Sequence, residues 1–316
     1  MLGEIGVKGV EELYADIPTS VRMKRRLNLP SPMSECEVRR HVEALLSRNR
    51  ASSDMPIFLG AGCWPHYVPA IVEEVVNRTE FATSYTPYQP EISQGLLQAL
   101  FEYQSMICEI TAMDAANCSL YDWASATGEA LRMAARVTHR AETLVPKIVH
   151  PERFSTLRTY VEPAGLRIGS VGYCLETGLL DLEDLKRKVS DKVAAVYVEN
   201  PSYLGFVETQ VDEVAEIAHD NGALLIVGVD PTSLGVLRPP GEYGADIVVG
   251  EGQPLGNSMN YGGPLLGLFA CRGDVELIRQ MPGRVVGMTT TLDGGRTGFC
   301  VALQTREQHI RRERAT

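Results

Sequence analysis

Residues 223–263, ALLIVGVDPTSLGVLRPPGEYGADIVVGEGQPLGNSMNYGG, decide the fold. An apolar run over 224–229 stops at Asp230-Pro231, and a second run over 247–249 opens into a glycine-rich segment without positive charge. Continuous apolar runs of this length are typical of strands that helices cover on both faces. Ligands bind at the carboxyl ends of such strands, so Asp230 and the loop after Val249 are the first places to look for a site.

The same pattern extends to both sides of this stretch. Helical segments alternate with apolar runs, and Gly222 is expected to end the helix before the 223–229 run. The predicted strands are 144–149, 167–171, 193–198, 223–229, 246–249 and 265–270, and the predicted helices are 152–161, 182–189 and 211–220. We therefore predict an α/β domain with a doubly wound, mostly parallel sheet and helices on both faces. No helix precedes the last strand, which is therefore free to run antiparallel.

Composition indicates an ordinary globular protein, with 44% hydrophobic and 22% charged residues among 316. The net charge of −10 argues against nucleic acid or an anionic membrane as a partner. No stretch approaches the ~20 apolar residues of a membrane span, and the first residues lack the apolar core of a signal peptide. The seven cysteines are scattered without C-x-x-C pairs or zinc spacing, which favours free thiols in a reducing cytoplasm and no metal site.

The two ends of the chain differ from the middle. Residues 1–55 are predicted to form a helical arm, in which Ser34 and Glu37 make a capping box. The helix after this box carries one apolar stripe that must dock on the body or on a partner, formed by Val38, Val42, Leu45 and Leu46. After Leu277 the chain is expected to be irregular to about Gly298. Residues 301–316 are expected to begin a charged helix that is cut short, which leaves 56–300 as the α/β domain.

Two loops are candidates for a site before any family is considered. Gly60-Ala61-Gly62, followed by Trp64, His66 and Tyr67, lines either a small-ligand pocket or a tight turn with aromatic packing. Pro87 and Pro90 keep the segment between them and its neighbours extended, since a residue before proline is pushed out of the α region. This segment therefore either presents Tyr85, Tyr88 and Gln89 to a site or forms an exposed turn.

A third candidate is the start of the helix after Asn117. Ser125, Thr127 and the Gly128 amide are expected at its N-terminus, where a phosphate can be held by free amides and the helix dipole. Taken alone this signal is weak, because many helices begin with Ser or Thr and Gly.

Three long motifs carry a resemblance to a known family: SYTPYQPEISQGLLQALFEYQ at 84–104, YDWASATGEALRMAAR at 121–136 and GEGQPLGNSMNYGGPLLG at 250–267. The chain resembles the α subunit (subunit 1, the N-terminal-half type) of the glycine cleavage system P-protein, glycine dehydrogenase (decarboxylating), from the arm to the last residue. The resemblance implies the large domain of a fold-type I pyridoxal-phosphate (PLP) enzyme. The family continues into a further small C-terminal domain, which this sequence lacks.

The resemblance also implies roles for several single residues. In such a fold a helix N-terminus, here Thr127-Gly128, holds the cofactor phosphate; a histidine, here His150, stacks on the pyridine ring; and a strand-end acid, here Asp230, pairs with the pyridinium nitrogen. A lysine on a loop beyond the acid forms the Schiff base. That region reads Gly-Glu-Gly-Gln at 250–253, and the last lysine of the chain is Lys192. The four residues are therefore expected to be vestigial, and the chain alone is not expected to run PLP chemistry.

The resemblance supplies a partner for this incomplete site. In the two-subunit enzyme the β subunit carries the PLP-lysine, the two subunits pair as a heterodimer, and two such pairs are expected to assemble. The enzyme decarboxylates glycine, releases CO2 and transfers the aminomethyl group to the lipoyl arm of the H-protein. Tyr85, Tyr88, Gln89 and His66, with Gly60 and Gly62, are expected to contribute to the partner's site. The alternatives are a non-catalytic scaffold or regulatory subunit, and a stand-alone desulfurase or aminotransferase, which the missing lysine disfavours.

Overall fold

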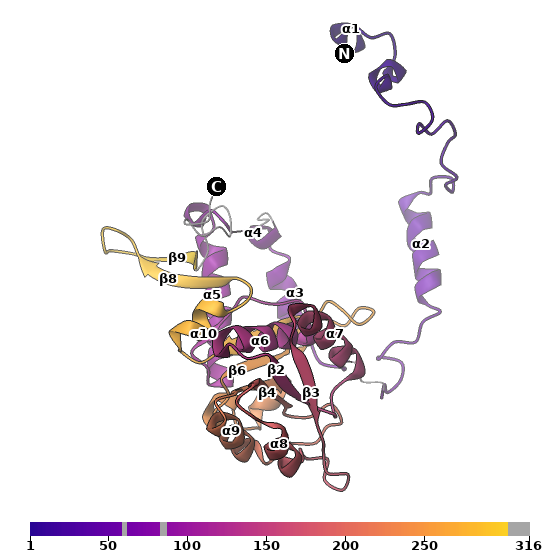
Figure 1. Ribbon diagram of the computed structural model, residues 1–316. Helices are drawn as coiled ribbons and strands as arrows, with labels where there is room; N and C mark the ends of the chain where they lie inside the picture. The colour runs from indigo at the N-terminus through magenta and orange to yellow at the C-terminus, as the bar shows by residue number, and fades with distance from the viewer. Residues whose placement is uncertain (59–61, 83–86, 303–316) are drawn as a thin grey trace. The chain divides into compact units, whose positions relative to one another are not determined.

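The computed structural model describes residues 1–58, 62–82 and 87–302 (Figure 1). The chain divides into two compact units, Met1–Pro56 and Ile57–Thr316. Among the described residues, no helix is long and apolar enough to cross a membrane.

The first unit contains two short helical turns, α1 (Leu2–Ile5) and η1 (Val10–Tyr14), and the longer helix α2 (Glu35–Leu46). The predicted capping box is confirmed: the Ser34 hydroxyl accepts from Glu37 N at 3.4 Å, and the Glu37 carboxylate accepts from Ser34 N at 2.7 Å. The predicted apolar stripe of α2 stays between 43% and 49% exposed, because this unit has no core large enough to cover it.

The second unit is built on a seven-stranded sheet with the order β1-β7-β6-β5-β4-β2-β3. Its strands are β1 (Ala115–Ala116), β2 (Glu142–Pro146), β3 (Arg167–Val171), β4 (Val193–Glu199), β5 (Leu224–Val229), β6 (Ile247–Glu251) and β7 (Gly267–Cys271). The five strands from β3 to β6 in this order are parallel, and β7 runs antiparallel to both β6 and β1. The mostly parallel sheet predicted from the sequence is therefore confirmed, and the last strand, whose direction the sequence left open, runs antiparallel.

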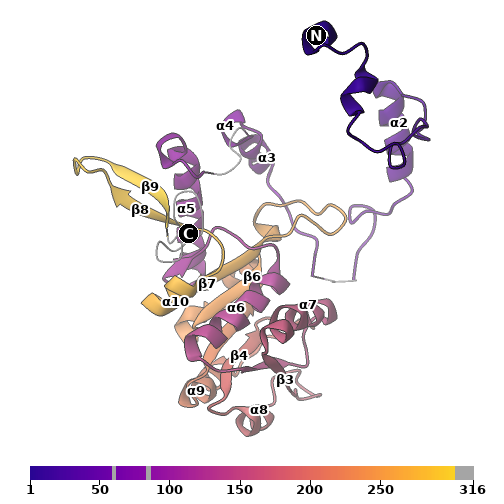
Figure 2. The ribbon, with the colours of Figure 1, turned by 45° about the horizontal axis from the view of Figure 1, so that its top comes forward.

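Helices cover both faces of this sheet, as predicted. The second unit contains the helices α3 (Ala70–Val76), α4 (Thr79–Ala82), α5 (Gln94–Thr111), α6 (Trp123–Thr138), α7 (Pro151–Val161), α8 (Leu182–Lys188), α9 (Val211–Asp220) and α10 (Val275–Gln280). It also contains the 3-10 turns η2 (Pro90–Ile92), η3 (Glu162–Ala164), η4 (Pro231–Gly235), η5 (Pro240–Tyr243) and η6 (Gln253–Leu255). Alternate residues of β4 point to opposite faces, so that Val196 packs with α8 and α9 while Tyr197 packs with α6 and α7. Figure 2 shows α6 lying across β4 and β6.

The structure of the segment after Leu277 differs from the sequence prediction. It forms an antiparallel hairpin of β8 (Val285–Thr290) and β9 (Thr297–Ala302), so the prediction of irregular structure to Gly298 is wrong. Residues 301 and 302 end β9 rather than begin a helix, and 303–316 lie outside the described residues.

Two glutamine side chains of α5 attach this hairpin to the body. Gln104 donates to Val286 O at 3.0 Å and accepts from Val286 N at 2.8 Å. Gln94 does the same for Phe299, at 2.9 and 2.8 Å. Each carboxamide pairs with the strand backbone as a neighbouring strand would, a long-range contact that local sequence patterns do not reveal.

Candidate functional site

The candidate site lies where the parallel strands end. Glu199 ends β4, Asp230 follows β5, Glu251 ends β6, and His150 lies after β2. The first residue of α6, Trp123, lines two cavities, one shared with Glu199 and Asp230 and the other with His150 and Glu251. The position agrees with the rule that ligands bind at the carboxyl edge of such a sheet.

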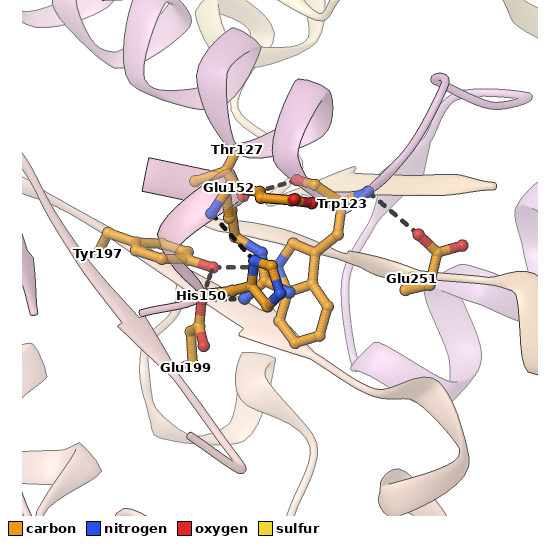
Figure 3. Close-up of polar contacts among 8 residues, drawn as sticks. Trp123, Thr127, His150, Glu152, Tyr197, Glu199 and Glu251 are labelled. Carbon is orange, nitrogen blue, oxygen red and sulfur yellow. Dashed lines mark hydrogen bonds and ion pairs between the residues drawn. The ribbon is translucent and has the colours of Figure 1, made fainter. Parts of the chain in front are cut away.

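The centre of the site is a buried hydrogen-bonded chain (Figure 3). Trp123 Nε1 donates to Tyr197 Oη at 3.0 Å, and Tyr197 Oη donates to Glu199 Oε1 at 2.9 Å. The three side chains are 7%, 1% and 2% exposed. Gly228 on β5 makes room for them, because a Cβ there would clash with Tyr197 Oη and lie 2.8 Å from Trp123 Nε1.

Arg153 of α7 completes this cluster. Its guanidinium lies 3.8 Å from the centroid of the Trp123 ring and forms a buried ion pair with Glu199. Burial raises the pKa of the Glu199 carboxyl, and the attraction of Arg153 opposes that rise. A buried pair of this kind is costly to break, because either charge left alone would be desolvated without compensation.

The start of α6 differs from the sequence prediction. The helix begins at Trp123, so Thr127 and Gly128 lie in its second turn and not at its N-terminus. Thr127 is fully buried and its hydroxyl donates to Trp123 O at 2.8 Å, while Gly128 packs against the Tyr160 ring. The prediction placed the helix start at the Ser/Thr cluster because it missed Asp122, whose carboxylate caps the helix.

Carboxylates hold two of the amides at this helix N-terminus. Asp122 Oδ1 accepts from Ser125 N at 2.7 Å. Glu251 Oε2 accepts from Trp123 N at 3.3 Å, as Figure 3 shows. These carboxylates already supply the negative charge that the helix dipole favours at this end. A bound anion would therefore have to displace them or lie beside them.

Glu251 lies in the region where the resemblance expects the Schiff-base lysine. Its carboxylate is 2% exposed and accepts from three backbone amides: Trp123 N, Gln253 N at 3.0 Å and Leu266 N at 2.8 Å. Burial raises the pKa of this carboxyl, while the three amides act in the opposite direction. Glu251 therefore joins the start of α6 to the loop after β6.

His150 and Asp230 are both engaged as caps. His150 Nδ1 accepts from Glu152 N at 3.1 Å at the start of α7, and its ring meets Tyr203 edge-on at 4.9 Å. Burial, and then Arg153, lower the pKa of His150. Asp230 Oδ1 accepts from Thr232 N at 2.9 Å and from the Thr232 hydroxyl at 2.6 Å, which is the capping role that the sequence left open.

The loop residues chosen from the sequence fall in different places. The ring nitrogens of His66 face Trp64 O at 2.9 Å and Asn257 O at 2.6 Å, so the ring bridges two loops. Tyr88 is 45% exposed with Arg284 over its ring at 5.7 Å, and Gln89 is exposed. Neither lines the cavities beside Trp123 in the described part of the chain, whereas Gly62 does. Gly60 and Tyr85 lie outside the described residues.

Four residues of the central cluster were not chosen from the sequence: Trp123, Arg153, Tyr197 and Glu199. Glu199 had a usable signal, since it ends the apolar run of β4 as Asp230 ends that of β5. Arg153 and Tyr197 had none, because only tertiary packing brings them to the same indole ring. Among the described residues, no group of three or more His, Cys, Asp and Glu side chains could hold a metal ion.

A mostly parallel sheet wound on both sides, with a strand-end acid, a histidine after an early strand and a helix that begins over the site, defines the large domain of the fold-type I PLP-enzyme class. A solved structure described as "glycine decarboxylase (P-protein) of the glycine cleavage system, in inhibitor-bound form" superposes with a TM-score of 0.88 at 43% identity, over all of this chain and 69% of that one. A sphingosine-1-phosphate lyase of Burkholderia pseudomallei shares the fold alone, with a TM-score of 0.59 at 13% identity, over 90% of this chain and 70% of that one.

Sequence relatives identify the particular family. The family described as "Glycine cleavage system P-protein" matches residues 1–316. Relatives from Staphylothermus marinus and Pyrococcus furiosus, each named "Probable glycine dehydrogenase (decarboxylating) subunit 1", are 51% and 53% identical over this whole chain and over 68% and 70% of their own lengths. The chain belongs to the glycine cleavage system P-protein family.

P-proteins are PLP-dependent, and the described residues of this chain do not fit that cofactor. The Trp123 indole and the Arg153–Glu199 pair line the space next to Asp230 and leave a cavity of only about 210 Å³ there, and carboxylates already hold amides of α6. The chain has no lysine after Lys192, and Glu251 stands buried in the expected region. A phosphate would therefore meet negative charge where the fold class offers free amides.

Proposed function

We propose that this chain is the α subunit of a two-subunit P-protein, and that it works only together with a β subunit that carries PLP. The pair decarboxylates glycine, releases CO2 and transfers the aminomethyl group to the lipoyl group of the H-protein. Two α and two β subunits form the complete enzyme. The observation that carries this proposal is Glu251, held by three amides where a Schiff-base lysine would be needed, in a chain about 50% identical to subunit 1 proteins.

The described residues support a division of labour between the subunits. Hydrogen bonds and an ion pair hold Trp123, Tyr197, Glu199 and Arg153 together at the end of β4. This cluster supports the structure of the chain and supplies no group for a covalent bond to the cofactor. Tyr88 and Gln89 remain exposed on the segment before α5, away from the cavities beside Trp123. We assign these two residues, with Tyr85, to the partner's active site, and His66 to the support of a neighbouring loop.

All seven cysteines are free. Unpaired thiols throughout a chain are typical of a reducing compartment, which supports a cytoplasmic location.

The test is reconstitution from separate subunits. We would purify this chain and a subunit-2 type partner, and measure glycine-dependent exchange of labelled bicarbonate in the presence of lipoylated H-protein. Activity is expected only in the mixture. The chain alone is expected to form no visible absorbance band with PLP that borohydride reduces onto the protein. Exchange by this chain alone, or a partner that is equally active without it, would refute the proposal.

A further inference from the structure

A cavity of about 210 Å³ lies next to Trp123, where β4 and β5 end. Its walls include Gly62, Trp64, Trp123, Tyr203, Glu199 and Asp230. One ordered water needs only about 10–15 Å³ of such space, so the cavity has room for a small organic molecule. It lies within this chain and takes no part in the chemistry proposed for the partner's cofactor.

The cavity is acidic. Two carboxylates, Glu199 and Asp230, line it against a single guanidinium, that of Arg153, among the described residues. Arg153 is already paired with Glu199, so the negative charge of Asp230 is not compensated within the lining. An anionic ligand would therefore be repelled.

Glu199 contributes a buried carboxylate to the wall of this cavity. Its Oε1 takes the hydrogen bond of Tyr197 and the ion pair with Arg153. Its Oε2 is buried out of reach of solvent, and a hydrogen bond from the Tyr203 backbone amide helps to lower the pKa of the carboxyl. Glu199 therefore acts on a molecule in the cavity through its charge and not through a direct hydrogen bond.

Aromatic rings form the remaining walls. Trp64, Trp123 and Tyr203 line the cavity, and one contact of this type already exists, since Arg153 lies over the Trp123 ring. Aromatic faces attract cations and tolerate the methyl groups that an ammonium nitrogen carries. The combination of carboxylates with aromatic walls selects a compact cation over a neutral molecule of the same shape.

We propose that this cavity binds a small organic ammonium ion, with its charge between Glu199 and Asp230 and its alkyl groups against Trp64 and Tyr203. This site goes beyond the proposed function, because it requires neither the partner subunit nor PLP.

The chain contains its own reporter for this site. Its only two tryptophans, Trp64 and Trp123, both line the cavity, so the intrinsic tryptophan fluorescence of the full chain reports on occupancy. We would titrate the full chain with choline, with its neutral carbon analogue 3,3-dimethylbutan-1-ol, and with sodium chloride at matched ionic strength. Choline is expected to give a saturable change, the neutral analogue to bind at least about tenfold more weakly, and the salt to give none.

Variants locate the binding. Asp230→Asn keeps an oxygen that can cap η4 but removes the charge, and Glu199→Gln removes the charge of the other carboxylate in the cavity wall. Each is expected to weaken choline binding at least about tenfold, whereas Glu216→Gln, an exposed carboxylate on α9, is expected to change nothing. Circular dichroism checks folding; if Glu199→Gln unfolds, Asp230→Asn decides.

Three results would overturn the assignment: no saturable change with choline in the folded chain, equal binding of the neutral analogue, or undiminished binding in folded Asp230→Asn. Since no partner subunit is present, these results are independent of the reconstitution of glycine exchange.

Discussion

Trp123 and Tyr197 are joined by a hydrogen bond of 3.0 Å from the indole N–H to the phenol oxygen, and this bond lies directly over Gly228 of β5. The two aromatic residues come from α6 and β4, far apart in the sequence, and meet over a strand that has no side chain at this point. The contact couples the helix that begins at the site to the strand that ends there.

Gly228→Ala tests this contact. The added methyl group would overlap Tyr197 Oη and lie 2.8 Å from Trp123 Nε1, both in a buried setting. We expect a loss of about 1–3 kcal/mol in the free energy of unfolding, typical of overpacking. Urea unfolding measures it. Gly235→Ala, where a Cβ would have no neighbour within 4 Å, serves as the control and is expected to stay within about 0.5 kcal/mol of the parent. Equal effects of the two changes would refute the steric argument.

Glu251→Lys tests whether a lysine in this region restores cofactor binding. The new ammonium would face three amide donors that now bind the carboxylate, Trp123 N, Gln253 N and Leu266 N, and none of these can accept its protons. We expect a loss of about 3–5 kcal/mol, because a buried charge is left unpaired. No PLP adduct is expected after borohydride reduction, as judged by mass spectrometry. The charge-neutral Glu251→Gln is the matched control and is expected to lose less. A PLP adduct on Lys at this position would contradict the poor fit of the cofactor.

Gln104→Leu tests the attachment of the hairpin. Loss of the carboxamide leaves Val286 N and Val286 O without their partner on α5. An unsatisfied buried polar group costs about 1–3 kcal/mol. We therefore expect the amides of β8 to exchange hydrogen faster in the variant than in the parent protein, while the exchange of β5 stays unchanged. Gln98→Leu, an exposed position on the same helix, is the control. Unchanged protection of β8 in Gln104→Leu would show that the glutamine pairing is not needed to hold the hairpin.

His219 provides a pH-dependent contribution to stability. Its Nε2 lies 2.9 Å from Asp246 Oδ2, and this hydrogen bond raises the pKa of the imidazole; Asp220 also raises it, while partial burial and Arg272 lower it. With the folded pKa above the unfolded value, the contribution is fully present below the unfolded pKa and is lost as pH rises through the folded pKa. Because the ring is partly exposed, we expect less than about 1 kcal/mol.

The measurement for His219 is urea unfolding at about pH 5.5 and about pH 8.5. His219→Gln is expected to lower stability more at the acidic pH than at the alkaline one. His41→Gln, an exposed position on α2, is expected to lower stability equally little at both. A larger effect of His219→Gln at the alkaline pH would reverse the assigned sign.

Tyr88→Ala combined with Gln89→Ala tests the contribution to the partner's site. Both side chains are exposed in this chain, so folding is expected to be unaffected while glycine exchange by the reconstituted enzyme falls at least about tenfold with PLP still bound to the partner. Gln98→Ala on α5 is the control. Full exchange activity in the double variant would favour the non-catalytic scaffold reading.

The sequence by itself determined the sheet and its covering helices. The alternation of apolar runs with amphipathic helices is a local property, and β3 and α9 begin and end where the sequence predicts. The long motifs also sufficed for the family, because their residues are read directly. The absence of a Schiff-base lysine was also visible in the sequence alone, because it requires only knowing which residue stands at each position.

Tertiary structure decided what occupies the site. Whether Asp230 faces a cofactor or caps a turn, and whether amides at the start of α6 are free or held by Asp122 and Glu251, depends on groups brought together from different strands and helices. The hairpin of β8 and β9 was missed for the same reason, since its backbone is held by glutamines that lie 182 and 205 residues earlier in the chain. Local periodicity predicts which face of an element is buried, but only the packed chain shows which polar group meets which.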